Sequence, residues 1–142
     1  MRGSIGWIVL ILLPALAAIG CPGDGSLLDD ITGPGGPEPT LAWIQANVFT
    51  PVCTECHVPG GSGPMPLDNE DASFQNLVSV PSLELPMMMR VAPGDAENSY
   101  LFWKVEGRLQ ILGSRMPPPP RPMLELEQIG AIVEWIDMGA QR

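Results

Sequence analysis

The chain's most reactive side chains lie within residues 53–57, which read CTECH. Cys53 and Cys56 are three residues apart, and His57, the only histidine in the chain, follows directly. Cys-x-x-Cys-His is the attachment pattern for c-type haem. Thiols three residues apart on a helical turn face the same side, so each can add across one vinyl group of one porphyrin. The adjacent imidazole can then bind the iron through Nε2, which predicts one covalently bound haem c.

Other uses of these three side chains are less well supported. A structural zinc needs four protein ligands and a catalytic zinc needs three, but the chain has no second Cys or His pair. An iron–sulfur cluster would need more cysteines, and a thioredoxin-like dithiol would need a βαβ context. A structural disulfide stays open as an alternative, because the start of the chain indicates export to an oxidising compartment.

The iron's second axial ligand cannot be another histidine of this chain, so a methionine thioether is expected. Met116 stands in GSRMPPPPRP, where four prolines follow it and fix an extended backbone. A stiff loop can hold a sulfur against iron at little cost in ordering entropy. We therefore predict Met116 as the ligand. The alternatives are the run Met87–Met89, Met65, and an open or water-filled position.

The start of the chain predicts export. Residues 1–20 have a short basic start, an apolar stretch and small residues before Cys21, as in a secretory signal peptide. The stretch LAAIGC resembles a bacterial lipoprotein signal, in which Cys21 becomes the lipidated first residue. Residues 21–40 are rich in Gly and Pro and predict a flexible tether. We expect a periplasmic or cell-surface lipoprotein held at a membrane by its lipid; a soluble secreted protein and an uncleaved anchor are the alternatives.

The charge of the chain limits its partners. Sixteen Asp and Glu oppose seven Lys and Arg, for a formal net charge of −9. Nucleic acid is not expected as a partner, because its phosphates require a basic surface. A protein partner with a basic docking patch would complement this surface. The alternative is that the charge only keeps the protein soluble.

The elements that must position these residues are predicted to be helices, which makes residues 41–142 an all-α domain. With 16 Gly and 17 Pro in the chain, we expect long Pro/Gly-rich loops. Thr40 is the expected N-cap of a first helix that Pro51 ends. Its expected buried face consists of Leu41, Ile44, Val48 and Phe49.

Three further helices are expected along the chain. The second is a short helix with Asp71 as its candidate N-cap. The third runs from about Asp95 to Glu106 and stops at Gly107. The last lies within residues 124–140 and ends at Gly139. Its expected apolar stripe consists of Leu126, Ile129, Val133 and Ile136, with Ile132 and Trp135 beside it.

From about Leu41 to Ala140 the chain resembles the bacterial class I cytochrome c domains with one haem. The resemblance rests on CTECH, with support from SRMPPPP and a last helix that contains EWIDMGA. It implies a small cytochrome c-type helical fold whose first and last helices cross beside the haem. It also implies Cys53 and Cys56 as thioether links, His57 as proximal ligand and Met116 as distal ligand.

The resemblance implies further positions around the haem. Phe49 and Trp135 match the family's aromatic positions, where core packing and haem contact coincide. Ala46 would be the small residue at the helix crossing, where many members have Gly. A backbone carbonyl near Pro64 would accept the second imidazole N–H. Arg90, Arg115 or Trp103 could hold a haem propionate; a plain surface or core role is the alternative.

These patterns predict an exported electron carrier rather than an enzyme, one that passes single electrons between redox partner proteins. One alternative is a haem-based sensor or peroxidase-like enzyme whose distal site is open because Met116 is not bound. Another is a haem-bearing accessory module of a larger oxidoreductase. A disulfide-stapled lipoprotein without haem is the third.

Overall fold

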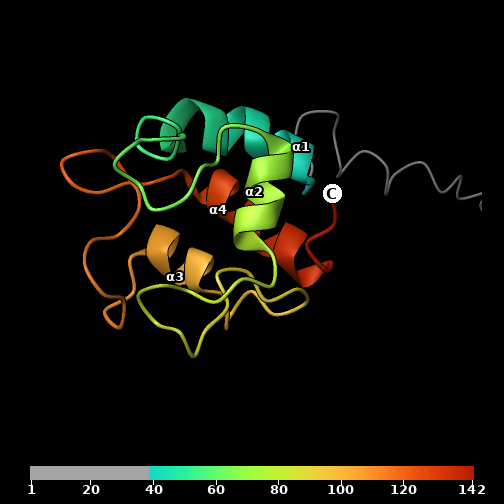
Figure 1. Ribbon diagram of the computed structural model, residues 1–142. Helices are drawn as coiled ribbons and strands as arrows, with labels where there is room; N and C mark the ends of the chain where they lie inside the picture. The colour runs from blue at the N-terminus through green and yellow to red at the C-terminus, as the bar shows by residue number, and fades with distance from the viewer. Residues whose placement is uncertain (1–38) are drawn as a thin grey trace, which may run out of the picture. The chain divides into compact units, whose positions relative to one another are not determined.

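The computed structural model describes residues 39–142, all of which belong to one compact unit. The predicted signal peptide, the lipidation site Cys21 and the tether up to residue 38 lie outside the described residues. In the view of Figure 1, α4 occupies the centre, α1 lies above it, α3 below it and α2 in front. The helical segments in chain order are α1 (Leu41–Ile44), η2 (Gln45–Cys53), α2 (Glu70–Leu77), α3 (Tyr100–Glu106) and α4 (Leu126–Asp137).

The first helical segments form as the apolar spacing predicts. The Thr40 side chain accepts a hydrogen bond from the Trp43 backbone N–H, which confirms it as the N-cap. All four residues of the expected inner face are at most 1% exposed: Leu41, Ile44, Val48 and Phe49. α1 packs against both α2 and α4, so this face closes the core.

The prediction that Pro51 ends the first helix is wrong. The chain continues through Pro51 to Cys53 as η2, a wider π-type helix whose capping Thr54 N–H donates to the Phe49 carbonyl. In an α-helix, Pro51 would lack the N–H that the Asn47 carbonyl accepts. That carbonyl accepts a hydrogen bond from the Gln128 side chain of α4. A tertiary contact thus compensates for the proline.

The starts of α2 and α3 also differ from expectation. Asn69, not Asp71, caps α2, because its side chain accepts from the Ala72 N–H. α3 begins at Tyr100 rather than near Asp95. Asp95 instead accepts from the side chain and the backbone N–H of Asn98, a local turn that competes with helix. The end of α3 at Gly107 is confirmed; this residue is left-handed, with φ +79°.

α4 is confirmed as the last helix, but the prediction of its buried face contains one error. Leu126 is 87% exposed and lies at the first helical position, before the stripe reaches the core. Ile132, Trp135 and Ile136 are at most 1% exposed. Gly139, at φ +100°, follows the end of the helix as expected.

The described residues form an all-α unit. Residues 39–142 contain only isolated β-bridges, within residues 78–99, and no strand. Between α3 and α4, residues 107–125 contain no helix. No helix in the described part of the chain is both long and apolar enough to cross a membrane.

Candidate functional site

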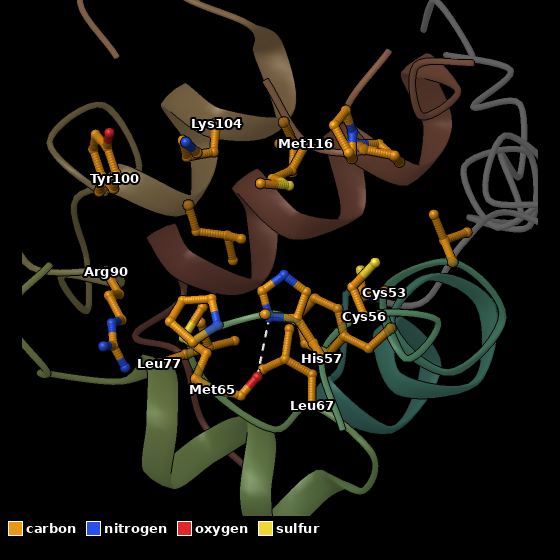
Figure 2. Close-up of a pocket in the computed structure, with 18 of the residues that line it drawn as sticks. Cys53, Cys56, His57, Met65, Leu67, Leu77, Arg90, Tyr100, Lys104 and Met116 are labelled. Atoms are coloured by element: carbon orange, nitrogen blue, oxygen red, sulfur yellow. Dashed lines mark hydrogen bonds between the residues drawn. The ribbon is translucent and has the colours of Figure 1, made fainter. Parts of the chain in front are cut away.

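A cavity of about 280 Å³ lies between η2, the segment after it, α2, α3 and the segment before α4. Its walls are mainly apolar. All four predicted haem residues line it: Cys53, Cys56, His57 and Met116. Figure 2 shows the His57 ring between Met116 on one side and Met65 with Leu67 on the other. The fold therefore brings together residues that are up to 63 positions apart in the sequence.

The CTECH segment keeps a helical turn after η2 ends at Cys53. The N–H groups of both Cys56 and His57 donate to the Cys53 carbonyl, at 3.1 and 2.8 Å. Both thiols are free and half-buried. The pKa of Cys53 is raised to about 12, mainly by burial and to a smaller extent by the nearby Cys56.

His57 is oriented by one hydrogen bond. Its Nδ1 lies 3.0 Å from the Met65 carbonyl oxygen. A carbonyl can only accept, so Nδ1 carries the proton and donates, and the lone pair is left on Nε2. Within the described residues, Nε2 has no hydrogen-bond partner. The ring is thus prepared as a ligand through Nε2, by the kind of partner that metal-bound histidines usually have. The carbonyl lies one residue beyond the predicted Pro64.

The segment that supplies this carbonyl, residues 58–67, is tied back onto the motif; we call it the proximal loop. The Gly63 N–H donates to the Cys56 carbonyl at 2.9 Å, and the Leu67 N–H donates to the His57 carbonyl at 2.8 Å. Gly63 also lies directly against the imidazole. A Cβ at this position would be 2.5 Å from His57 Nδ1. Only glycine lets the backbone approach the ring so closely.

Gln45 connects the proximal loop to the helices. It is 7% exposed, and its Nε2 donates to the Leu67 carbonyl at 2.9 Å. Its Oε1 accepts from the Ser73 hydroxyl of α2 at 2.7 Å. The residue next to it, Ala46, is exposed, so the prediction that Ala46 occupies the helix crossing is wrong. The buried position at this point belongs to a hydrogen-bonded glutamine.

Met116 lies in the segment 107–125, which we call the distal segment. Its backbone N–H donates to the Lys104 carbonyl of α3 at 2.7 Å. The competing methionines are placed differently. None of Met87, Met88 and Met89 lines the cavity, and Met87 is 97% exposed. Met65 lines it, but on the side of the carbonyl that holds His57 (Figure 2).

A polar group lines one part of the cavity wall. Lys104, Glu84 and Tyr100 are in mutual contact there, and Arg90 lies nearby. Burial raises the pKa of Glu84, but hydrogen bonds from Lys104 and Tyr100 outweigh it and hold that pKa below its ordinary value. Arg90 pairs with no carboxylate among residues 39–142, and burial lowers its pKa. It remains the cation most available to an anionic group in the cavity.

Three other residues predicted near haem do not line the cavity: Arg115, Trp103 and Trp135. The Arg115 side chain donates to the carbonyls of Pro117 and Arg121 within its own segment. Trp103 donates to the Glu97 carbonyl on the surface of α3. Trp135 is a core residue whose indole donates to the Gln141 carbonyl, whereas Phe49 does line the cavity.

An ion pair connects the motif to the distal segment. Glu55, between the two cysteines, accepts from Arg121 at 2.9 Å through Nε and is also paired with Nη2. The Arg121 side chain is 34% exposed and that of Glu55 63%. Hydrogen bonding from Arg121, then its charge, lowers the pKa of Glu55. Because both groups are exposed, we regard this pair as a weak contact at the edge of the cavity.

Sequence reasoning missed Gly63, Gln45, Lys104 and the Glu55–Arg121 pair. One signal was present for Lys104, the only lysine in the chain, which stands in the apolar run LFWKV four residues after Tyr100. A charge within such a run predicts either an exposed position or a buried ion pair. Gln45 and the Glu55–Arg121 pair depend on contacts between distant segments, and Gly63 depends on how the proximal loop turns back onto His57.

Among residues 39–142, no group of three or more His, Cys, Asp or Glu side chains is placed to hold a metal ion. Comparison with protein-family models, with curated proteins and with solved structures finds no match to this chain. The function of this chain is therefore inferred from the residues and geometry of the cavity.

Proposed function

We propose that this chain is an exported c-type cytochrome that carries one covalent haem and passes single electrons between redox partners. One observation carries the proposal. Cys53, Cys56 and His57 line the same apolar cavity as Met116, and the imidazole is held so that Nε2 is its free nitrogen. This set matches the attachment pattern and the ligand types of an electron-transfer haem.

The residues around the cavity fit such a group. Apolar side chains of η2, α2 and α3 would cover a porphyrin face, among them Phe49, Leu77 and Leu101. Arg90 offers a cation for a carboxylate of the macrocycle. The free thiols of Cys53 and Cys56 can each add their S–H across one vinyl group, a reaction that needs no oxidant.

Each residue has a separate role in this proposal. The two cysteines would prevent loss of the cofactor outside the cell. His57 would bind iron through Nε2 while its Nδ1–H donates to the Met65 carbonyl, which makes the imidazole a stronger ligand. Met116 would supply a thioether, a ligand that raises the reduction potential. When bound, haem supplies a one-electron ferrous–ferric couple; the surrounding side chains exclude water and keep both ligands in place.

The finer parts of the proposal concern fold family, location and partners. We propose a cytochrome c-type arrangement, supported by the packing of α1 against α4. The composition of residues 1–21 supports export and lipidation at Cys21. The acidic surface favours redox partners with a basic docking patch. Mass spectrometry of Cys21→Ala tests the lipid: the wild-type chain should carry it and the variant should not.

The central experiment is visible spectroscopy of the chain matured in an exporting host, combined with a pyridine haemochrome assay. We expect a c-type spectrum with the weak long-wavelength band of iron–thioether bonding, and loss of that band in Met116→Ala. Cys53→Ala with Cys56→Ala should prevent covalent attachment. A colourless wild-type protein would contradict the proposal. Haem without the band would instead favour the open-site sensor or enzyme, and a stable co-purifying partner would favour the accessory module.

A further inference from the structure

Lys104 is the only lysine in the chain and is buried, with 7% of its surface exposed. A buried ammonium is costly unless its donors are satisfied. Here Nζ donates to Glu84 Oε2 at 2.8 Å and to the Leu112 carbonyl at 2.9 Å. The ring of Tyr100 lies 5.7 Å from the same nitrogen. The contact with Glu84 neutralises the charge, and the contact with Leu112 reaches into the distal segment.

The main chain of Lys104 reaches the same segment at a second point. α3 ends at Gly107, so carbonyls of its last turn have no partner inside the helix. The Trp103 carbonyl is satisfied by the N–H groups of Gly107 and Arg108. The Lys104 carbonyl accepts from the Met116 N–H at 2.7 Å. The direction of that carbonyl is set by the helix, so it also sets the position of the Met116 backbone.

Residues 112–116 are therefore attached to Lys104 at both ends. The Leu112 carbonyl is bonded to Nζ, and the Met116 N–H is bonded to the main-chain oxygen. Tyr100 adds to the first attachment, since its hydroxyl accepts from the Leu112 N–H at 3.1 Å and donates to Glu84. No helix within residues 107–125 could hold Met116 instead.

We propose that Lys104 is a positioning residue for Met116: its carbonyl and its ammonium group hold the two ends of residues 112–116 on α3, so that the Met116 thioether faces His57 across the cavity. This inference rests on the proposed function, because it assigns Lys104 a role in keeping the distal ligand bound. The substitution Lys104→Met removes the ammonium contacts and keeps the side-chain length. The Met116 backbone contact stays in this variant, but the Leu112 end loses the ammonium and is held only by the bond from its N–H to Tyr100.

The test measures how easily an added ligand displaces Met116 from the ferric protein. Imidazole is titrated into wild type, Lys104→Met, Lys104→Arg and Arg142→Gln, and the long-wavelength band is followed. Arg142 forms a surface ion pair with Asp71 and does not line the cavity, so it is a control with the same change of charge. Haem content and thermal unfolding are recorded for each variant to separate displacement from global destabilisation.

The apparent affinity for imidazole rises in proportion to the loss of Met116 binding. For Lys104→Met we expect at least about tenfold tighter imidazole binding, which corresponds to about 1.4 kcal/mol. Lys104→Arg should restore most of the wild-type value. Arg142→Gln should stay within about twofold of it, as for a surface ion pair.

Each outcome decides a separate claim. If wild type has haem and the band, but Lys104→Met binds imidazole as Arg142→Gln does, the positioning role is wrong and the proposed function stands. If wild type lacks the band, Met116 is not the ligand and both ideas fail. If Lys104→Met does not fold, imidazole is titrated into Glu84→Gln instead, because this variant removes the ionised partner of the ammonium group and leaves Lys104 in place. A smaller increase in imidazole affinity in Glu84→Gln supports the positioning role of Lys104, and an unchanged affinity overturns it.

Discussion

The two sides of the cavity are held in different ways. The proximal loop is fixed by main-chain hydrogen bonds to Cys56 and His57 and by the close approach of Gly63 to the imidazole. The distal segment is fixed to a large extent by charged side chains: Lys104 and Glu84 at one end, Arg115 within it, and Arg121 with Glu55 at the edge. The main-chain hydrogen bonds of the proximal loop involve no ionisable side chain, whereas the contacts of the distal segment depend on several.

This difference has a consequence for the proposed ligands. Main-chain hydrogen bonds keep their geometry over a wide range of pH and salt, whereas ion pairs weaken with screening and with protonation. We therefore expect the His57 side to stay intact under conditions that loosen the Met116 side. Four predictions test this comparison, in order of decreasing effect.

The largest effect is expected for Gly63→Ala. The new Cβ would lie 2.5 Å from His57 Nδ1, and the ring cannot move without losing its bond to the Met65 carbonyl. We expect a loss of about 3 kcal/mol of unfolding free energy and a low yield of haem-bearing protein. Denaturant unfolding and haem content measure the two effects.

Gly130→Ala is the matched control. It lies within α4, and a Cβ there would have no neighbour within 4 Å. Alanine favours helix over glycine by about 0.5–1 kcal/mol, so this variant should be as stable as wild type or more so. Equal behaviour of the two variants would disprove the close packing of Gly63 on the imidazole.

Gln45→Ala should weaken the proximal loop from the helical side. It leaves the buried Leu67 carbonyl and the Ser73 hydroxyl without the bonds they make in the wild type. We expect a loss of about 2 kcal/mol in stability, with little dependence on salt. The control is Gln75→Ala on the exposed side of α2, which should be near neutral. A strong salt dependence of the Gln45 effect would contradict the comparison.

Glu84 should make the distal side sensitive to acid. Its pKa is lowered in the folded protein from an ordinary value of 4.5, because hydrogen bonds from Lys104 and Tyr100 outweigh the effect of burial. Its stabilising contribution is therefore complete above that value and is lost as the pH falls through the lower folded-state pKa. Thermal unfolding should place wild type a few degrees above Glu84→Gln at neutral pH, and the two should converge in acid. A constant difference at all pH values would be evidence against this role.

The smallest effect is expected for Arg121→Gln, which removes the exposed pair with Glu55. The melting temperature should fall by less than for Glu84→Gln. The difference between wild type and Arg121→Gln should be present at about 0.01 M salt and absent at about 1 M salt. Unfolding measured at both salt concentrations decides this. If the difference persists at high salt, the pair is not the screened surface contact that its exposure indicates.

Much of the fold follows from local sequence. The inner face of the first helical segments, the Thr40 cap and the end of α3 at Gly107 follow from apolar spacing and capping rules. The errors arose where a contact with another segment, or a competing local turn, overrode the local signal. Pro51 does not end its helix, because that helix widens and Gln128 of α4 bonds to the Asn47 carbonyl. Asp95 forms a local turn rather than the start of α3.

The sequence by itself determined which groups are present: two thiols and an imidazole in one pattern, no second histidine, and a methionine before four prolines. Only the tertiary structure decided how they meet. It placed Met116 rather than Met87 at the cavity, chose the Met65 carbonyl to orient His57, and buried Lys104 under the distal segment. The physical reason is that spacing along a chain fixes neighbours within a helical turn, whereas contacts beyond one turn depend on how the loops and helices pack around the whole core.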